Sequence, residues 1–192
     1  WARGESVSVE LSGGSLAEPL EVRIDGESVR LPGRNVSLPL PFVRGTGKEI
    51  LEPNSEGPHC LVDATVVNGR VSKAGESDRY SLDVQEGEEW LIETQAAGLG
   101  TSHLYSLLTL HDQDGRKLGS AGDQEPEELL SFIRARAETF GDPYIGFRVP
   151  EGVSRIDLTI EDLLGRGGPG FGYRLVARRQ PGDFVVRLND SV

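Results

Sequence analysis

The chain has 192 residues, and its 31 acidic and 20 basic side chains give a formal net charge of -11 at pH 7. This charge repels phosphate backbones, so nucleic acid is excluded as a partner. No apolar run in the sequence approaches the ~20 residues that span a bilayer, so we expect no membrane insertion. The single cysteine cannot form an internal disulfide. With only three histidines beside it, the sequence has no Cys/His spacing for a structural zinc site.

The first 47 residues predict a small β segment. Alternating apolar and polar residues favour strands over 6–11, 20–24 and 36–40, and Gly-Gly, Asp-Gly and Pro-Gly pairs separate them. So few residues give only a thin core. We therefore expect 1–47 to be the end of an immunoglobulin-like neighbour, or a small sheet that leans on the next module.

Residues 44–60 have no periodicity and are rich in Gly, Pro, Glu and Asn, which is typical of a surface linker. A domain boundary is expected there, so that the main domain spans 48–179. The chain contains no Met and opens on Trp1 without a signal sequence, so we expect it to be an excised or processed piece of a longer protein.

The main domain is predicted to be all-β. Turn signals at Asn68-Gly69, Glu86-Gly87 and Asp114-Gly115 separate short alternating runs at the spacing of a sandwich or barrel. The predicted strands cover 64–71, 78–84, 89–96, 107–112, 144–149, 155–161 and 173–178.

Two segments of the chain have other predictions. Over 123–138 an N-capping Asp123 and a shared face of Leu129, Leu130 and Ile133 favour a helix, while the alternation around Phe132 equally favours a strand. We leave both alternatives open. The tail 180–192 follows a Pro-Gly pair and predicts the first strand of a following module.

Six short motifs follow one another in order along the main domain: EPN at 52–54, VNGRV at 67–71, GESDRYSL at 75–82, GEEWLIE at 87–93, LLTLHDQDG at 107–115 and GRGGPGFGYRL at 165–175. From residue 50 to 178 this order resembles the bacterial pre-peptidase C-terminal (PPC) domain. That domain accompanies many secreted peptidases and large exported proteins of planctomycete-like bacteria. The chain departs from the family pattern at Glu76, where Asp is usual, and at 124–140, which look inserted.

The resemblance implies a PPC-type, jelly-roll-like antiparallel β-sandwich in a protein that is periplasmic, secreted or on the cell surface. It also implies a non-catalytic accessory, spacer or binding module. The expected partners are neighbouring domains of the parent chain, or a polysaccharide or protein polymer. The alternatives are a calcium-stabilised carbohydrate- or protein-binding module, and a non-catalytic part of a secreted hydrolase or peptidase.

Some members of the family bind calcium, and the residues that match their ligands are Glu52, Asn54, Glu76 and Asp78. Calcium takes about six to eight oxygen ligands, which these side chains, carbonyls and water would supply. In the alternative interpretation, Glu52 and Asn54 cap a linker turn and Asp78 closes a hairpin.

Other acidic residues form a patch that we interpret as a solvated loop, because it lacks the remaining ligands of an EF-hand. Its members are Asp112, Asp114, Asp123, Glu125, Glu127 and Glu128.

No catalytic group is predicted. His59 and Cys60 are neighbours in an extended segment and point to opposite faces, so they form no dyad. Cys60 is expected to be a small buried filler. The run 165–172, GRGGPGFG, lacks the Lys-Ser/Thr of a phosphate loop and predicts a turn. Arg166 in this run, with Tyr105 and Phe171, is a candidate surface for a carbohydrate or protein contact.

Overall fold

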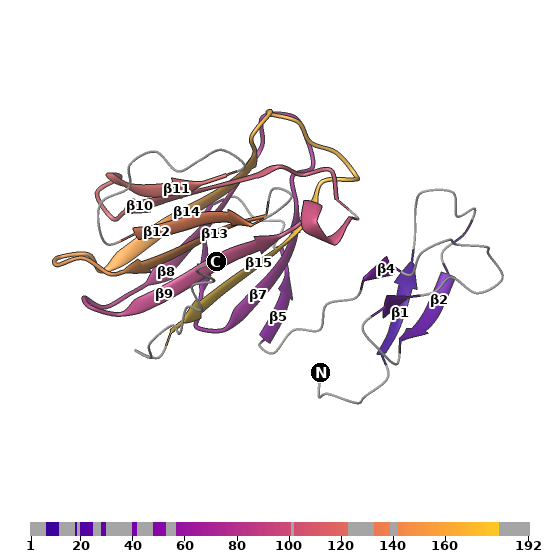
Figure 1. The fold of residues 1–192 in the computed structure, drawn as a ribbon, viewed down its shortest axis with the longest axis horizontal. Coiled ribbons are helices and arrows are strands. Elements are labelled where there is room, and N and C mark those ends of the chain that lie inside the picture. The colour runs from indigo at the N-terminus through magenta and orange to yellow at the C-terminus, as the bar shows by residue number, and fades with distance from the viewer. Residues whose placement is uncertain are drawn as a thin grey trace, which may run out of the picture.

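The computed structural model describes residues 7–11, 18, 20–24, 28–29, 40–41, 48–52, 57–100, 102–122, 133–138 and 142–180. Two sheets form a sandwich, as the sequence predicted (Figure 1). The five-stranded sheet has the order β11 (Lys117–Ala121), β10 (Ser106–Asp112), β14 (Arg155–Asp162), β8 (Ser77–Asp83), β6 (His59–Leu61). The six-stranded sheet has the order β12 (Ile133–Glu138), β13 (Asp142–Arg148), β9 (Glu89–Gln95), β15 (Gly172–Arg179), β7 (Thr65–Arg70), β5 (Lys48–Leu51).

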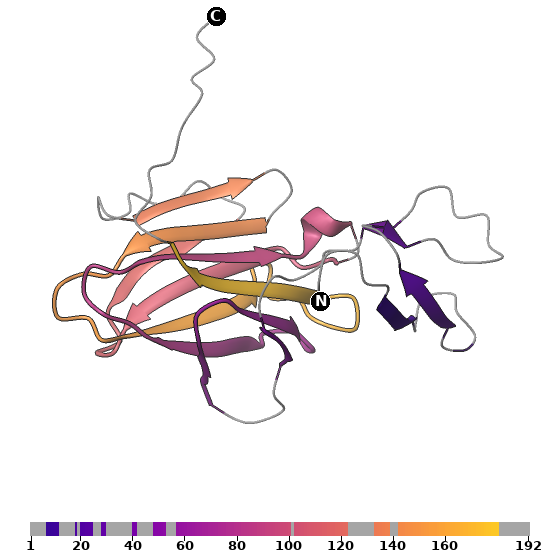
Figure 2. The same ribbon diagram turned by 90° about the horizontal axis from the view of Figure 1, so that it is seen from below.

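The core lies between the two sheets, because alternate side chains of each strand face the opposite sheet. In β8, Tyr80 and Leu82 are fully buried, and in β9 Trp90 and Ile92 occupy the equivalent inward positions. In Figure 2 the yellow strand β15 lies beside the magenta strand β9 in the six-stranded sheet. All seven strands predicted between residues 64 and 178 are confirmed.

The first part of the chain forms two small antiparallel sheets. β1 (Val7–Leu11) pairs with β2 (Leu20–Ile24), and β3 (Ser28–Val29) pairs with β4 (Leu40–Pro41). The predicted strands at 6–11 and 20–24 are confirmed, with Val22 and Ile24 buried. Most of the predicted strand at 36–40 lies outside the described residues. Figure 1 draws β1, β2 and β4 to the right of the sandwich.

The segment predicted to be a linker contributes strands to both sheets, which corrects that part of the prediction. β5 pairs in parallel with β7, and β6 pairs in parallel with β8, so each becomes the outer strand of its sheet. The side chains of β5 are mostly exposed, and β6 has only three residues. Such edge strands carry no alternating apolar pattern, although they cover the backbone groups of β7 and β8.

Asn68-Gly69 is not a turn, contrary to the prediction. It lies inside β7, and a Cβ atom at residue 69 would stand 2.4 Å from the ring of Tyr173 on the neighbouring strand β15. Glycine is needed here because an aromatic ring covers the backbone. The predicted turns at Gly87 and Gly115 are confirmed, with φ values of 82° and 79°.

Residues 133–138 form strand β12, paired with β13, so the strand alternative is correct for this part of 123–138. Residues 123–132 and the predicted strand in 181–192 lie outside the described residues. β11 was not predicted from the sequence, and Gly119 and Ser120 occupy its middle.

In the described part of the chain the helical structure is the 3-10 turn Ala97–Leu99. Asp142 organises it, since its carboxylate accepts hydrogen bonds from the backbone N–H of Ala96 and of Gly98, both at 2.9 Å. None of the helices described here has the length and apolarity that a membrane crossing requires.

Candidate functional site

The three candidate contact residues come together on one surface. Tyr105 precedes β10, Arg166 follows β14 and Phe171 precedes β15. The guanidinium carbon of Arg166 lies 4.8 Å from the ring centroid of Tyr105 and 5.2 Å from that of Phe171. Both distances lie within the range of cation–π interactions. The sequence suggested each residue separately, and the fold joins them into one arginine–aromatic group.

A buried carboxylate holds this group in place. Asp162 ends β14 and its side chain has no exposed surface. Its Oδ1 accepts hydrogen bonds from the backbone N–H and the Nε of Arg166, both at 3.0 Å. Its Oδ2 accepts from Nη2 of Arg166 at 2.9 Å and from the backbone N–H of Tyr105 at 3.1 Å. Arg166 also donates from Nη2 to the carbonyl of His103 at 2.9 Å. The guanidinium therefore has a fixed orientation.

The ion pair is charged on both sides. Burial favours the neutral form of Asp162, but the hydrogen bonds from Arg166 and from backbone amides outweigh it and hold the pKa of this carboxyl below its usual range. The same pair raises the pKa of Arg166. The two charges compensate each other, so this surface has little net charge of its own.

The surface faces solvent. Tyr105 is 39% exposed and Leu164 is 62% exposed, and the side chain of Arg166 is 39% exposed. His103 is exposed, and its ring meets the ring of Phe171 at a centroid distance of 6.1 Å. We call His103, Tyr105, Leu164, Arg166 and Phe171 the Tyr105 surface.

The glycine-rich run beside this surface is a turn, as predicted. Its Gly170 lies against His103, since a Cβ atom there would stand 2.8 Å from the imidazole ring. The backbone carbonyl of Gly170 also accepts a hydrogen bond from the N–H of His103 at 2.8 Å. The run therefore brings the loop before β10 against the loop before β15.

The arrangement of Asp162 and Arg166 occurs a second time in the chain. Asp112 ends β10, and its carboxylate accepts from the backbone N–H and the Nε of Arg116, at 2.9 and 3.0 Å. Both copies have the pattern Asp-x-x-Gly-Arg, at 112–116 and 162–166. Sequence reasoning missed this repeat, which is the signal that would have located both ion pairs.

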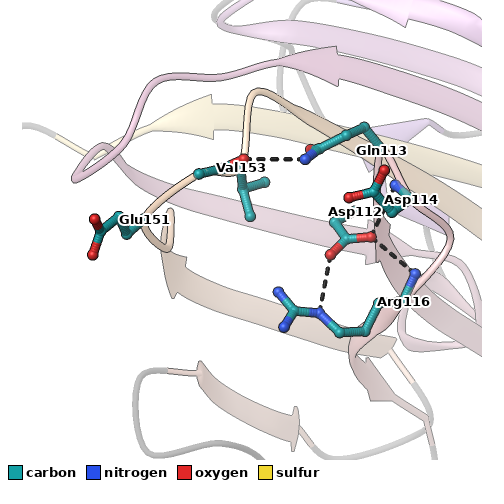
Figure 3. Close-up of a pocket in the computed structure, with 7 residues that line it drawn as sticks. Asp112, Gln113, Asp114, Arg116, Glu151 and Val153 are labelled. Atoms are coloured by element: carbon teal, nitrogen blue, oxygen red, sulfur yellow. Dashed lines mark hydrogen bonds and ion pairs between the residues drawn. The ribbon is translucent and has the colours of Figure 1, made fainter.

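The second copy lines a shallow polar pocket of about 320 Å³ (Figure 3). Gln113 spans this pocket: its amide donates to the carbonyl of Gly152 at 3.0 Å and accepts from the N–H of Ser154 at 3.2 Å. In Figure 3 Glu151 points away from Asp112. Asp112, predicted to lie in a solvated acidic loop, is instead buried, because turn amides and Arg116 satisfy its carboxylate. The patch members from Asp123 to Glu128 lie outside the described residues.

The candidate calcium ligand Asp78 belongs to a buried hydrogen-bond chain. The hydroxyl of Tyr173 donates to its Oδ2 at 2.7 Å, and the hydroxyl of Tyr80 lies 2.6 Å from that of Tyr173. The carboxyl groups of Asp78 and Glu52 are hydrogen-bonded to each other. Burial, followed by the charges of Glu52 and Glu76, raises the pKa of Asp78 to about 7 against the opposing effect of Tyr173.

The other candidate ligands have their own contacts. Glu76 accepts hydrogen bonds from the backbone N–H of Ser72 and, at 3.0 Å, of Lys73. Glu52 accepts from the N–H of Arg70 at 2.9 Å. In the described residues no three Asp, Glu, His or Cys side chains are placed to hold a metal ion together. Asn54 lies outside these residues. The calcium site therefore stays a prediction. Among the described candidate ligands, Glu52 and Asp78 are the two whose carboxyl groups lie together.

Cys60 is exposed, contrary to the expectation of a buried filler. It lies in the middle of edge strand β6, whose other two residues, His59 and Leu61, are more buried. Its Sγ lies 4.0 Å from Oδ2 of Asp83, whereas the ring of His59 lies beside that of Tyr80, at a centroid distance of 6.2 Å. The two neighbours therefore point in different directions, as predicted.

No family model matches the chain, and no curated protein matches it. Among solved structures it is similar to the pre-peptidase C-terminal domain of a collagenase from Bacillus anthracis. The sequences are 11% identical, the match covers 66% of this chain and 99% of that one, and the TM-score is 0.46. This solved domain has the family name that the motifs of the main domain suggested.

Proposed function

We propose that the chain is a non-catalytic module of an exported protein, and that it binds a neutral extracellular or cell-wall polysaccharide through the Tyr105 surface. The observation that carries this proposal is the fixed position of Arg166, which contacts the rings of Tyr105 and Phe171 and pairs with the buried Asp162. A surface that is ordered by folding loses little side-chain entropy when a ligand binds.

The chemistry of the surface favours sugar rings. Exposed aromatic side chains stack on the apolar faces of sugars, and Tyr105 and Arg166 add hydrogen-bond donors for hydroxyl groups. The ion pair with Asp162 compensates the charge of Arg166, so the surface has no excess charge for an ionic ligand. The net charge of -11 on the whole chain repels polyanionic glycans. A neutral polysaccharide fits both facts.

A protein partner fits the surface less well. Stable protein interfaces bury about 800 Å² on each side around an apolar centre. On the Tyr105 surface the large apolar side chains with high exposure are Tyr105 and Leu164. One exposed tyrosine ring suits the apolar face of a sugar, whereas the two side chains supply little of a protein interface centre.

A non-catalytic role is supported by the structural role of three carboxylates, two of which, Asp112 and Asp162, are buried. Asp112, Asp142 and Asp162 all accept hydrogen bonds from backbone amides of turns. Their oxygens stabilise the ends of strands. The resemblance of the motifs to PPC domains supports export and an accessory role beside other domains.

Retention on insoluble cellulose, chitin and xylan tests the proposal, with pectate as a polyanionic comparison. Tyr105→Ala is expected to weaken retention about tenfold, equivalent to about 1.4 kcal/mol, whereas Tyr105→Phe keeps the ring and stays within about twofold. Arg116→Ala is the matched control, because it removes the arginine of the second Asp-x-x-Gly-Arg copy.

Thermal melts of each variant verify folding. We expect the incubated polysaccharide to release no soluble sugar. Equal retention of wild type and Tyr105→Ala, or no retention of the wild type on any neutral polysaccharide, would overturn the proposed function.

A further inference from the structure

The chain enters and leaves the sandwich at the same end of one sheet. Lys48, the first residue of β5, is in register with Thr65 of β7, and Thr65 is in register with Ala177 near the end of β15. Neighbouring strands lie about 4.8 Å apart, so Lys48 and Ala177 are separated by about 10 Å. In Figure 1 β5 begins, and β15 ends, on the lower side of the six-stranded sheet.

Side-chain contacts hold the first of these two strands. Glu49 of β5 accepts from Nη2 of Arg174 on β15 at 2.7 Å and from the amide of Asn68 on β7 at 3.2 Å. The backbone N–H of Glu52 also donates to the carbonyl of Asn68 at 2.9 Å. β5 is thereby tied to both β7 and β15.

The end of β15 is held as firmly. The backbone N–H of Arg179 donates to Oδ1 of Asp63 at 2.8 Å. Its guanidinium carbon lies 5.4 Å from the ring centroid of the buried Trp90, and its Nη1 lies 3.2 Å from the carboxylate of Glu88. The backbone N–H of Gln180 continues the pattern with the carbonyl of Glu89 at 2.8 Å. The path of the chain is therefore fixed up to residue 180.

The Tyr105 surface lies at the other end of the sandwich. Phe171 immediately precedes β15, and Arg179 lies seven positions after Gly172, which corresponds to about 24 Å of strand. Ser106, next to Tyr105, is in register with Asp162, so these two belong to the same end. In Figure 1 the yellow-orange loop after β14 rises above the sheets, away from the start of β5.

We propose that the sandwich is a side arm and not an in-line spacer. Lys48, where the chain enters the sandwich, and Ala177, near where it leaves, lie only about 10 Å apart, so the sandwich adds little length to the path of the chain. It displays the Tyr105 surface about 24 Å away from that path. This inference builds on the proposed function, since it assigns the polysaccharide to the free end of the arm.

Spin labels in a Cys60→Ser background test the geometry in the full chain. Lys48→Cys with Arg178→Cys is expected to give a distance below about 20 Å, including the label arms, and Leu164→Cys with Arg178→Cys a longer one. All three positions are exposed. Denaturant is the control, because the 129 residues between the first pair then separate the two labels widely. A first-pair distance equal to or longer than the second would overturn the side arm.

Binding is read out with spin labels as well. The polysaccharide that retains the wild type is expected to slow the motion of a label at Pro169→Cys, an exposed position in the run beside the Tyr105 surface, and leave those at 48 and 178 unchanged. Slowing at 48 or 178 instead would place the ligand at the attached end and refute its assignment to the free end. Absence of retention on every polysaccharide refutes the proposed function, while the distance measurements still decide the geometry.

Discussion

Replacing Asp78 by Asn should change how the stability of the protein depends on pH. The pKa of Asp78 is raised from 3.8 to about 7, chiefly by burial. Between these pH values the folded state binds a proton that the unfolded state has lost. The stability due to this proton is complete below pH 3.8 and is lost as the pH rises through 7. One pKa unit corresponds to about 1.4 kcal/mol, so the full loss is roughly 4 kcal/mol.

Urea unfolding in EDTA, followed by fluorescence from pH 4.5 to 7.5, measures this loss. Trp90 is a suitable reporter because it is buried in the core. Wild type is expected to lose free energy of unfolding relative to Asp78→Asn as the pH rises, by about 1 kcal/mol per pH unit around pH 6. Asn keeps the size of the side chain and accepts the hydrogen bond of Tyr173, but does not titrate.

Glu52→Gln is the companion variant, because the charge of Glu52 contributes to the raised pKa of Asp78. Its removal should lower that pKa and make the pH dependence shallower than in wild type. Parallel profiles of wild type and Asp78→Asn across this pH range would refute the reasoning. They would show that Asp78 is ionised in the folded protein at pH 4.5.

Three further predictions follow from the structure. Gly69→Ala should destabilise the fold by about 2 kcal/mol in urea unfolding, because its Cβ would stand 2.4 Å from the ring of Tyr173; an unchanged midpoint would contradict this packing. At 2 mM calcium the melting temperature should rise over that in EDTA if the Glu52–Asp78 pair takes part in the predicted calcium site, and Asp78→Asn should abolish the rise. Cys60 should react with a thiol reagent in the native protein as fast as in urea, whereas slow reaction would place it in the interior.

The strands of the core could be predicted because each has one buried face. In β9 the inward-facing residues Trp90, Ile92 and Thr94 alternate with more exposed residues, so the sequence itself shows the two-residue period of a strand. The outer strands β5 and β6 lack such a face. They form because β7 and β8 offer unpaired backbone groups, and a single sequence does not show where such partners lie.

Asn68-Gly69 shows a second limit of sequence reasoning. The pair is the usual signal of a hairpin turn, since Gly supplies a positive φ. Here the glycine serves a different need, because Tyr173 of the adjacent strand occupies the space of a Cβ. A tight turn and close packing against a neighbouring ring both require glycine. Only the position of the distant tyrosine distinguishes between them.

The two Asp-x-x-Gly-Arg turns show why the candidate site could be predicted only in part. Both fix an arginine against a buried aspartate, so the motif by itself specifies a way to end a strand. Around Arg116, Gln113 joins the neighbouring turn at Gly152 and the arginine side chain stays 68% exposed. Around Arg166 the same geometry meets two aromatic rings.

Those rings come from loops that the order of strands brings together. Tyr105 and Phe171 lie far apart in sequence, but each immediately precedes a strand that starts at the same end of the sandwich as Asp162, where β14 ends. The binding surface is therefore a product of topology acting on a structural motif. Moving an aromatic residue next to Arg116, on the other end of β10, should create a similar arginine–aromatic contact there. It would not create polysaccharide retention at the free end, and this separates the contribution of the motif from that of its location.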